Sequence, residues 1–275
     1  MTGTIRNLIV ATLKRLDVAI TRSSKLERLE KLNTKGDTID LLLEFPDQLA
    51  EHLLRALRHS KSQLRQDLFV LSQLSLKVNG FFVEFGATNG IDLSNTYILE
   101  KEFGWQGILA EPARCWHQAL RENRQCHVET DCVWRESNAV LKFDETGLSQ
   151  LSTISAFKSS DWHKPARAAA SQYTVKTISL EDLLDKYSAP RIIDYLSIDT
   201  EGTEYEILKA FNFDRYDFRV MTCEHNFSKQ REKIFNLLTS KGFVRKLEAY
   251  SAFDDWYVKP GLVCSPAASQ IHFNR

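Results

Sequence analysis

The sequence predicts an α/β fold in which helices cover both faces of a mostly parallel sheet. From residue 81 onward, short apolar runs alternate with segments of helical periodicity. The runs are apolar on both faces, as is typical of strands buried on both sides. The chain has 275 residues, of which 43% are hydrophobic and 26% charged, so it can build one large core.

Residues 1–60 differ from the rest, and we expect a helical extension there. Apolar residues recur at helical spacing in the segments 5–20, 24–32 ("SKLERLEKL") and 47–60 ("DQLAEHLLRALRHS"). Between residues 5 and 35, eight Lys and Arg against three Asp and Glu leave an excess of five positive charges. Two interpretations stay open: an amphipathic helix at a membrane surface, or helices that pack on the body of the protein or on a second copy.

Residues 61–275 form the predicted α/β domain. Its main strands are expected at 81–85 ("FFVEF"), 107–111 ("GILAE"), 127–133 ("HVETDCV"), 195–199 ("YLSID") and 219–225 ("RVMTCEH"). Additional strands are expected at 139–144 and 173–178. A closing antiparallel hairpin is expected from segments 242–250 and 255–259. Helices are expected at 94–103, 114–123, 180–187, 203–210 and 228–240.

One long segment, residues 145–172, has weak periodicity and predicts a loop on the substrate side of the domain. Trp162, His163, Lys164 and Arg167 in this loop are candidates for a lid over a sugar or phosphate.

Charge and cysteine content exclude several classes of protein. The 36 basic residues balance the 36 acidic ones, which argues against nucleic acid as the main partner. Five cysteines without a CxxC pair favour reduced thiols over disulfides or a zinc site. No apolar run approaches the roughly 20 residues of a membrane span. A cytoplasmic protein is expected, membrane-peripheral if its basic helices rest on lipid.

The residues that end the first two strands predict a nucleoside site, because ligands of open α/β sheets bind at the carboxyl ends of strands. The first strand ends in "EFGATNG", with Glu84, Gly86 and Gly90. The second ends at Glu111, which is placed to accept both hydroxyls of a ribose. The third ends near Asp131 and Cys132, where an adenine would lie; alternatively, Asp131 is a solvated loop acid and Cys132 a packed thiol.

The spacing of the glycines distinguishes between adenosine ligands. A dinucleotide site needs G-x-G-x-x-G, whereas this chain has G-x-x-x-G with Glu84 two residues upstream. A carboxylate there would repel a pyrophosphate but suits an ammonium, which indicates S-adenosylmethionine. The predicted cofactor-binding residues are Glu84, Gly86, Ala87, Thr88, Asn89, Gly90, Ser94, Glu111, Pro112, Asp131, Cys132 and Asp199.

The blocks "FVEFGATNGIDLSNT", "GILAEP", "TISLEDLL", "YLSIDTEGTEYEIL" and "CEHN" together resemble the FkbM-type S-adenosylmethionine-dependent methyltransferases. The resemblance covers residues 62 to 247, beginning with "SQLRQDLFVL". It implies a Rossmann-like class I methyltransferase with a seven-stranded sheet, and methylation of an oxygen, often a sugar hydroxyl.

Acidic residues end the fourth and fifth strands, where Asp199, Glu224 and His225 are the predicted catalytic residues. Two interpretations stay open. In the first, the three residues hold a Mg²⁺ or Mn²⁺ ion that lowers the pKa of a substrate hydroxyl. In the second, either His225 or Asp199 acts as a general base. Purely structural roles are the alternatives. Asp199 and Glu224 would then cap a helix or form a salt bridge, and His225 would make a structural hydrogen bond. Glu204 and Glu206 are expected to be exposed helix residues.

The sequence as a whole therefore predicts an O-methyltransferase that acts on a hydroxyl of a saccharide, polysaccharide or glycolipid. A nicotinamide-dependent oxidoreductase and a non-catalytic adaptor with the same fold are the alternatives. The missing third glycine counts against the oxidoreductase, and the presence of Gly86, Asp199 and Glu224 counts against the adaptor.

Overall fold

The computed structural model describes residues 37–145, 153–154 and 171–261. The chain divides into two compact units, Met1–Glu44 and Phe45–Arg275. In the first unit, residues 37–43 are helical. The expected helices before residue 36, the candidate lid from Trp162 to Arg167 and the fifth cysteine lie outside the described residues.

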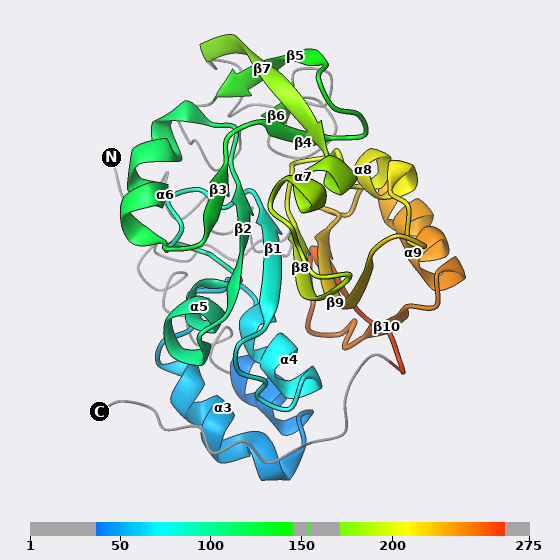
Figure 1. The fold of residues 1–275 in the computed structure, drawn as a ribbon. Coiled ribbons are helices and arrows are strands. Elements are labelled where there is room, and N and C mark those ends of the chain that lie inside the picture. Colours follow the sequence, from blue (N-terminus) through cyan, green and yellow to red (C-terminus); the bar gives the residue numbers. More distant parts are fainter. Residues whose placement is uncertain (1–36, 146–152, 155–170, 262–275) are drawn as a thin grey trace, which may run out of the picture. The chain divides into compact units, whose positions relative to one another are not determined.

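The second unit contains the predicted, mostly parallel, seven-stranded sheet, with strand order β10-β11-β9-β8-β1-β2-β3 (Figure 1). The strands are β1 (Phe81–Phe85), β2 (Gln106–Ala110), β3 (His127–Glu129), β8 (Ile192–Ile198), β9 (Asp217–Glu224), β10 (Val244–Lys246) and β11 (Asp254–Val258). All neighbours pair in parallel except β11, which runs antiparallel to both β9 and β10. The expected closing hairpin is therefore confirmed, and β11 inserts between β9 and β10.

Helices cover both faces of this sheet. On one face, Leu183, Ile207 and Ile234 from three helices share a core with residues of β1, β8 and β9. On the other face, Phe69 stacks on Trp256 of β11 at 4.8 Å between ring centroids. The helices of this unit are η1 (Asp47–Leu49), α3 (Ala50–Leu57), α4 (Gln66–Gln73), α5 (Tyr97–Phe103), η2 (Arg114–Trp116), α6 (His117–Asn123), α7 (Leu180–Lys186), α8 (Glu204–Ala210) and α9 (Gln230–Ser240).

A second, four-stranded sheet has the order β4-β7-β5-β6. Its strands are β4 (Cys132–Trp134), β5 (Val140–Glu145), β6 (Thr153–Ile154) and β7 (Ser171–Ser179). The prediction of one strand over 127–133 is wrong, because the chain leaves the first sheet after β3 and enters the second at β4. Glu129 Oε1 accepts hydrogen bonds from the amides of Thr130 and Asp131, which removes those amides from a strand ladder.

No helix among the described residues combines the length and the apolar character that crossing a membrane requires.

Candidate active site

The polar residues that end the central strands lie in one row across the sheet. Phe85 of β1 pairs with Ala110 of β2 and with Ile198 of β8, and Ile198 pairs with Cys223 of β9. One residue further along each strand, the row continues through Glu111, Gly86, Asp199 and Glu224, and Glu224 pairs with Asp254 of β11. The sheet thus brings together residues that are up to 168 positions apart in the chain.

A cavity of about 1070 Å³, including the open space at its mouth, lies over this row. Its lining includes seven acidic residues: Glu84, Asp92, Glu111, Asp199, Glu201, Glu224 and Asp254. Among the described residues that line it, none is Lys, Arg or His. Such a cavity favours a cationic ligand or one rich in hydrogen-bond donors over a phosphate-bearing one.

The turn after β1 needs glycine at its first position. Gly86 has a φ of 75°, and a Cβ atom built on it would lie 2.2 Å from the carbonyl oxygen of Asp199. Its amide donates to the carbonyl oxygen of Ala110. The turn therefore lies against both neighbouring strands, and a side chain at Gly86 would push Asp199 away.

Glu111 ties this turn to β2. Its Oε2 accepts a hydrogen bond from the Thr88 amide and its Oε1 one from the Ala113 amide, both at 2.8 Å. Burial raises the pKa of Glu111 to about 7, against the effect of these two amides. Each carboxylate oxygen keeps a further lone pair, so the side chain can still accept hydroxyl groups from the cavity.

Glu84 is held more tightly by its own loop than the sequence suggested. It accepts hydrogen bonds from the Asn95 amide at 2.7 Å and from the hydroxyls of Ser94 at 2.9 Å and Thr96 at 2.5 Å. Arg124 Nη1 lies 3.9 Å away. The charge of Glu84 is thus partly balanced within the protein, although the residue lines the cavity.

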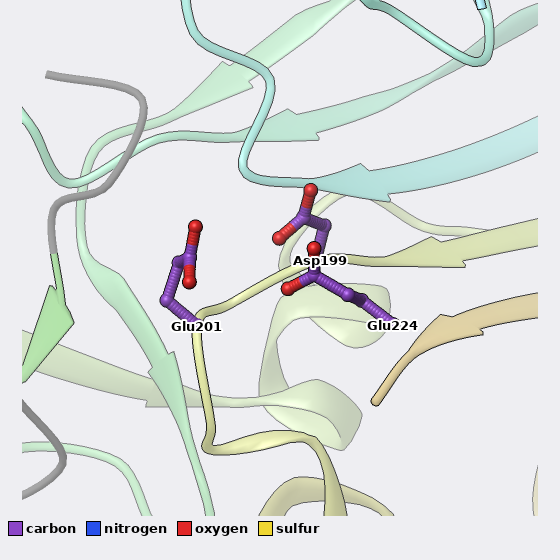
Figure 2. A group of neighbouring side chains, drawn as sticks. All are labelled: Asp199, Glu201 and Glu224. Carbon is purple, nitrogen blue, oxygen red and sulfur yellow. The ribbon is translucent and has the colours of Figure 1, made fainter. Parts of the chain in front are cut away.

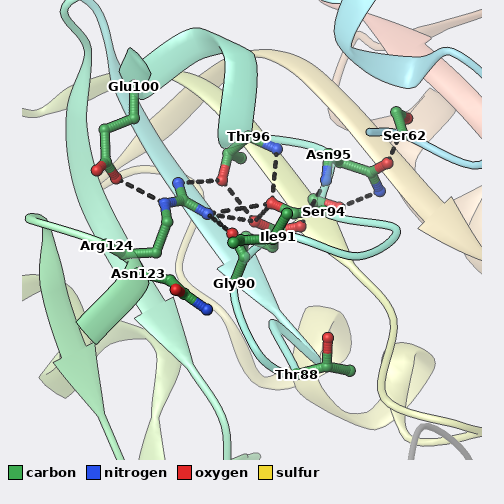
Figure 3. A network of polar contacts seen from close by, with 12 residues as sticks. Ser62, Thr88, Gly90, Ile91, Ser94, Asn95, Thr96, Glu100, Asn123 and Arg124 are labelled. Atoms are coloured by element: carbon green, nitrogen blue, oxygen red, sulfur yellow. Dashed lines mark hydrogen bonds and ion pairs between the residues drawn. The ribbon is translucent and has the colours of Figure 1, made fainter. Parts of the chain in front are cut away.

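Arg124, whose side chain is fully buried, connects this loop to α5 (Figure 3). It donates hydrogen bonds to the Gly90 carbonyl oxygen at 3.0 Å, to Ser94 Oγ at 3.1 Å and to Thr96 Oγ1 at 2.9 Å. It also pairs with Glu100 at 2.8 Å. Four hydrogen-bond acceptors therefore converge on one guanidinium, which fixes the loop that carries the Glu84 ligands.

The predicted cofactor residues divide into two groups by position. Those that line the cavity are Glu84, Gly86, Thr88, Glu111, Pro112, Cys132 and Asp199, whereas Ala87, Asn89, Gly90, Ser94 and Asp131 do not. Asn89 Oδ1 accepts hydrogen bonds from the amides of Ile91 and Asp92 and so shapes the turn. Asp131 lines a neighbouring hollow with Arg114, His117 and Lys176.

Cys132 is a packed thiol that also lines the cavity. It is buried, and burial raises the pKa of its thiol to about 12.

Three carboxylates converge above the tips of β8 and β9 (Figure 2). One oxygen each from Asp199, Glu201 and Glu224 lies within 4.8 Å of the others, close enough to hold a divalent cation. Burial, followed by the proximity of Asp199, raises the pKa of Glu224 well above its usual range. Burial also raises the pKa of Asp199, and the Glu224 side chain opposes that shift. Asp199 lies beside Glu224 and is open to the cavity.

His225 does not join Asp199 and Glu224. It follows Glu224 directly, so its side chain points to the opposite face of the sheet. There its Nδ1 accepts a hydrogen bond from the Phe227 amide at 3.0 Å, and its Nε2 lies 3.7 Å from Asp255 Oδ1. Burial lowers the pKa of His225, and the residue does not line the cavity.

Glu204 is buried, so the expectation of an exposed helix residue is wrong. Its Oε1 accepts hydrogen bonds from the amides of Thr200 and Gly202 at 3.0 and 2.9 Å. It thereby holds the turn that places Glu201 in the cavity.

Sequence reasoning missed three of the acidic cavity residues, Asp92, Glu201 and Asp254. Glu201 adopts a left-handed conformation with a φ of 58°, which turns it back toward the strand ends. Asp254 begins an antiparallel strand, so the first residue of β11, and not its last, reaches the carboxyl edge. Burial raises the pKa of Asp254 well above its usual range.

The chain was compared with known proteins. Residues 84–256 match the family model described as "Methyltransferase FkbM domain", which covers well over half of the chain. No curated protein matches the sequence.

Two solved structures give weak structural matches. The precorrin-6y C5,15-methyltransferase from Geobacter metallireducens GS-15 is 13% identical over 70% of this chain and 85% of its own, with a TM-score of 0.36. The fibrillarin/Nop5p complex is 14% identical over 71% of this chain and 79% of its own, also with a TM-score of 0.36. Similarity at this level carries no argument about the site.

Proposed function

Because the chain belongs to the methyltransferase FkbM domain family, which supports S-adenosylmethionine-dependent methyl transfer, we propose that it methylates a hydroxyl group of a saccharide, polysaccharide or glycolipid. The observation that carries the proposal is the row of acids beside a glycine turn at the strand tips. Seven acidic residues would repel a pyrophosphate, which counts against a nicotinamide cofactor.

Glu111 and the Gly86 turn would hold the nucleoside. Both oxygens of Glu111 face backbone amides and keep lone pairs for two ribose hydroxyls. S-adenosylmethionine, when bound, supplies a methyl group activated by its sulfonium. Its positive charge suits a cavity whose described lining lacks basic residues.

Asp199 is the base in this proposal. A hydroxyl must lose its proton as it takes up a methyl group. Asp199 is open to the cavity and would take up the proton of the substrate hydroxyl, whereas His225 faces away. The rate would come mainly from positioning the two reactants and from this proton transfer.

A divalent cation at Asp199, Glu201 and Glu224 is the second candidate for activating the hydroxyl, because the three oxygens lie within 4.8 Å of one another. Metal-free protein, prepared with EDTA and assayed with and without Mg²⁺ or Mn²⁺, separates the two. Full activity without metal supports Asp199 acting alone. Activity that returns only with metal supports the cation.

The first test is calorimetry with S-adenosylhomocysteine on the pure, folded chain, where we expect binding. The second is transfer of a radiolabelled methyl group from S-adenosylmethionine to a panel of glycans and glycolipids. Binding with transfer to a hydroxyl supports the proposal, and transfer to nitrogen contradicts it. Binding without transfer to any acceptor supports the adaptor, and fluorescence titration with NADH tests the oxidoreductase.

The basic segment within residues 5–35 remains a proposed contact with a membrane surface or with a second copy in the cytoplasm. Flotation with anionic vesicles and sedimentation analysis distinguish the two.

A further inference from the structure

Part of the cavity wall lies outside the residues that match the family model. That match begins at residue 84, yet Gln63 and Gln66 line the cavity beside Phe253 and Asp254. Gln63 precedes α4, Gln66 begins it, and Asp254 begins β11. The proposed cofactor-binding part of the cavity leaves these residues without a role.

The segment that carries the two glutamines is fixed to the glycine-turn side of the cavity. Ser62 forms a β-bridge with Leu93, and its Oγ lies 2.5 Å from Gln66 Oε1. The same Oγ lies 2.5 Å from Asn95 Oδ1 (Figure 3). Asn95 in turn donates to Ser197 Oγ of β8 at 3.0 Å. These contacts therefore hold the segment in place as part of the cavity wall.

Asp254 has one oxygen without a hydrogen bond. It is only 4% exposed, and its Oδ2 accepts a hydrogen bond from Gln66 Nε2 at 3.0 Å. Its Oδ1 forms no hydrogen bond of ordinary length and angle, although the Trp256 indole, whose Nε1 also forms none, interacts with this carboxyl group. Leaving a buried carboxylate oxygen unpaired is unfavourable, so this position calls for a ligand group. A hydroxyl both donates and accepts, whereas a cation offers no acceptor for the indole.

The position of Asp254 separates it from the proposed nucleoside site. Glu111 and Asp254 are the two ends of the row, four strand spacings or about 19 Å apart. Glu224, paired with Asp254, lies between it and Asp199. A ring whose one hydroxyl faces Asp199 can therefore present another hydroxyl to Asp254.

We propose that Gln63, Phe253 and Asp254 form the acceptor subsite, with Asp254 accepting a hydroxyl that is not methylated. Gln66 is a positioning residue, since its amide holds Asp254 Oδ2. Phe253 supplies an apolar face and the exposed Gln63 an adaptable amide, a combination suited to a polyol ring. The inference rests on the proposed function and concerns only its acceptor half.

Saturation-transfer NMR on the full chain, saturated with S-adenosylhomocysteine, tests this subsite. The probes are methyl glycosides of neutral hexoses and 6-deoxyhexoses. The variants are Gln63→Ala, which is exposed and so keeps the fold, and Asp254→Asn. Gln118→Ala is the matched control, because Gln118 lies on α6, is exposed like Gln63 and bonds only to Glu122 among the described residues.

We expect at least one glycoside to bind the unmodified chain and the control alike, and both variants to bind it roughly three- to tenfold more weakly. Their affinity for S-adenosylhomocysteine should stay unchanged. Three results would overturn the inference. Gln63→Ala binds the glycoside as well as the unmodified chain does, the unmodified chain binds no glycoside, or the variants lose affinity for S-adenosylhomocysteine in parallel. If S-adenosylhomocysteine itself does not bind the unmodified chain, the proposed function fails instead.

Discussion

At the level of single residues, Glu111 is the one whose ionisation bears most directly on the proposed cofactor. Two backbone amides donate to its carboxylate, yet burial raises its pKa to about 7. The protonated form loses acceptor capacity on one oxygen. A fraction of the molecules near neutral pH therefore lacks the full set of acceptors for a ribose.

We predict that affinity for S-adenosylhomocysteine increases about tenfold from about pH 6 to about pH 8 and then levels off. Glu111→Gln should remove this dependence and weaken binding by about 1–3 kcal/mol. Calorimetry across this pH range measures both, with the exposed Glu136→Gln as the control. An unchanged pH dependence in Glu111→Gln would contradict the assignment.

The same shift affects folding. Because the pKa of Glu111 is higher in the folded state than its usual value, its contribution to the free energy of unfolding is greatest at low pH. That contribution decreases as the pH rises through about 7.

The position of some site residues could be predicted from the sequence, but that of His225 could not. Asp199 and Glu224 were found because acids at strand ends are rarely buried without a purpose. His225 was grouped with them, although adjacent residues of a strand face opposite sides. The alternation was readable in the sequence; the hydrogen bond from the Phe227 amide to His225 was not.

At the level of elements, the loop between β1 and α5 depends on a single residue after α6. Arg124 contacts Gly90, Ser94 and Thr96 and pairs with Glu100. Burial raises the pKa of Glu100, but Arg124 and the Gln125 amide outweigh it and lower the value to about 2. The guanidinium thus stabilises both the loop and a partly buried carboxylate.

We predict that Arg124→Met lowers the free energy of unfolding by about 3–5 kcal/mol, because it leaves buried carboxylates without their partner. Urea denaturation measures this, and Arg135→Met, at an exposed ion pair, is the control. Equal stability of the two variants would contradict the stabilising role that the contacts of Arg124 indicate.

Elements with clear periodicity could be predicted, and two others could not. The strand 81–85 was predicted at the bounds that β1 has. Helix α4 was missed because Gln66 to Ser72 are all buried, so the sequence "QDLFVLS" has no exposed face to give a helical period. The break between β3 and β4 was missed because it depends on a side chain, Glu129, bonding to the next two amides.

At the level of the whole molecule, overall neutrality conceals an uneven distribution of charge. The chain has equal numbers of acidic and basic residues, but seven acids line the cavity and its described lining has no basic residue. Burial raises the pKa of four of these acids, Glu111, Asp199, Glu224 and Asp254, so the negative potential of the cavity increases as the pH rises.

We predict that S-adenosylmethionine binds more tightly than S-adenosylhomocysteine at low salt, because it carries one more positive charge. Its advantage should shrink by roughly two- to fivefold as NaCl rises to about 0.5 M, since salt screens the attraction. Parallel calorimetric titrations of the two ligands measure this. A ratio of affinities that does not change with salt would contradict an electrostatic role for the cavity.

The antiparallel course of β11 has a consequence for how the protein is made. The proposed acceptor wall joins Gln63, which precedes the sheet, to Asp254, which belongs to the last strand placed in it. A ribosome would have exposed the turn at Gly86 and the tip of β8 long before it reached residue 254. The residues of the proposed nucleoside site would therefore leave the ribosome before Asp254, and the proposed acceptor wall would be completed later than that site.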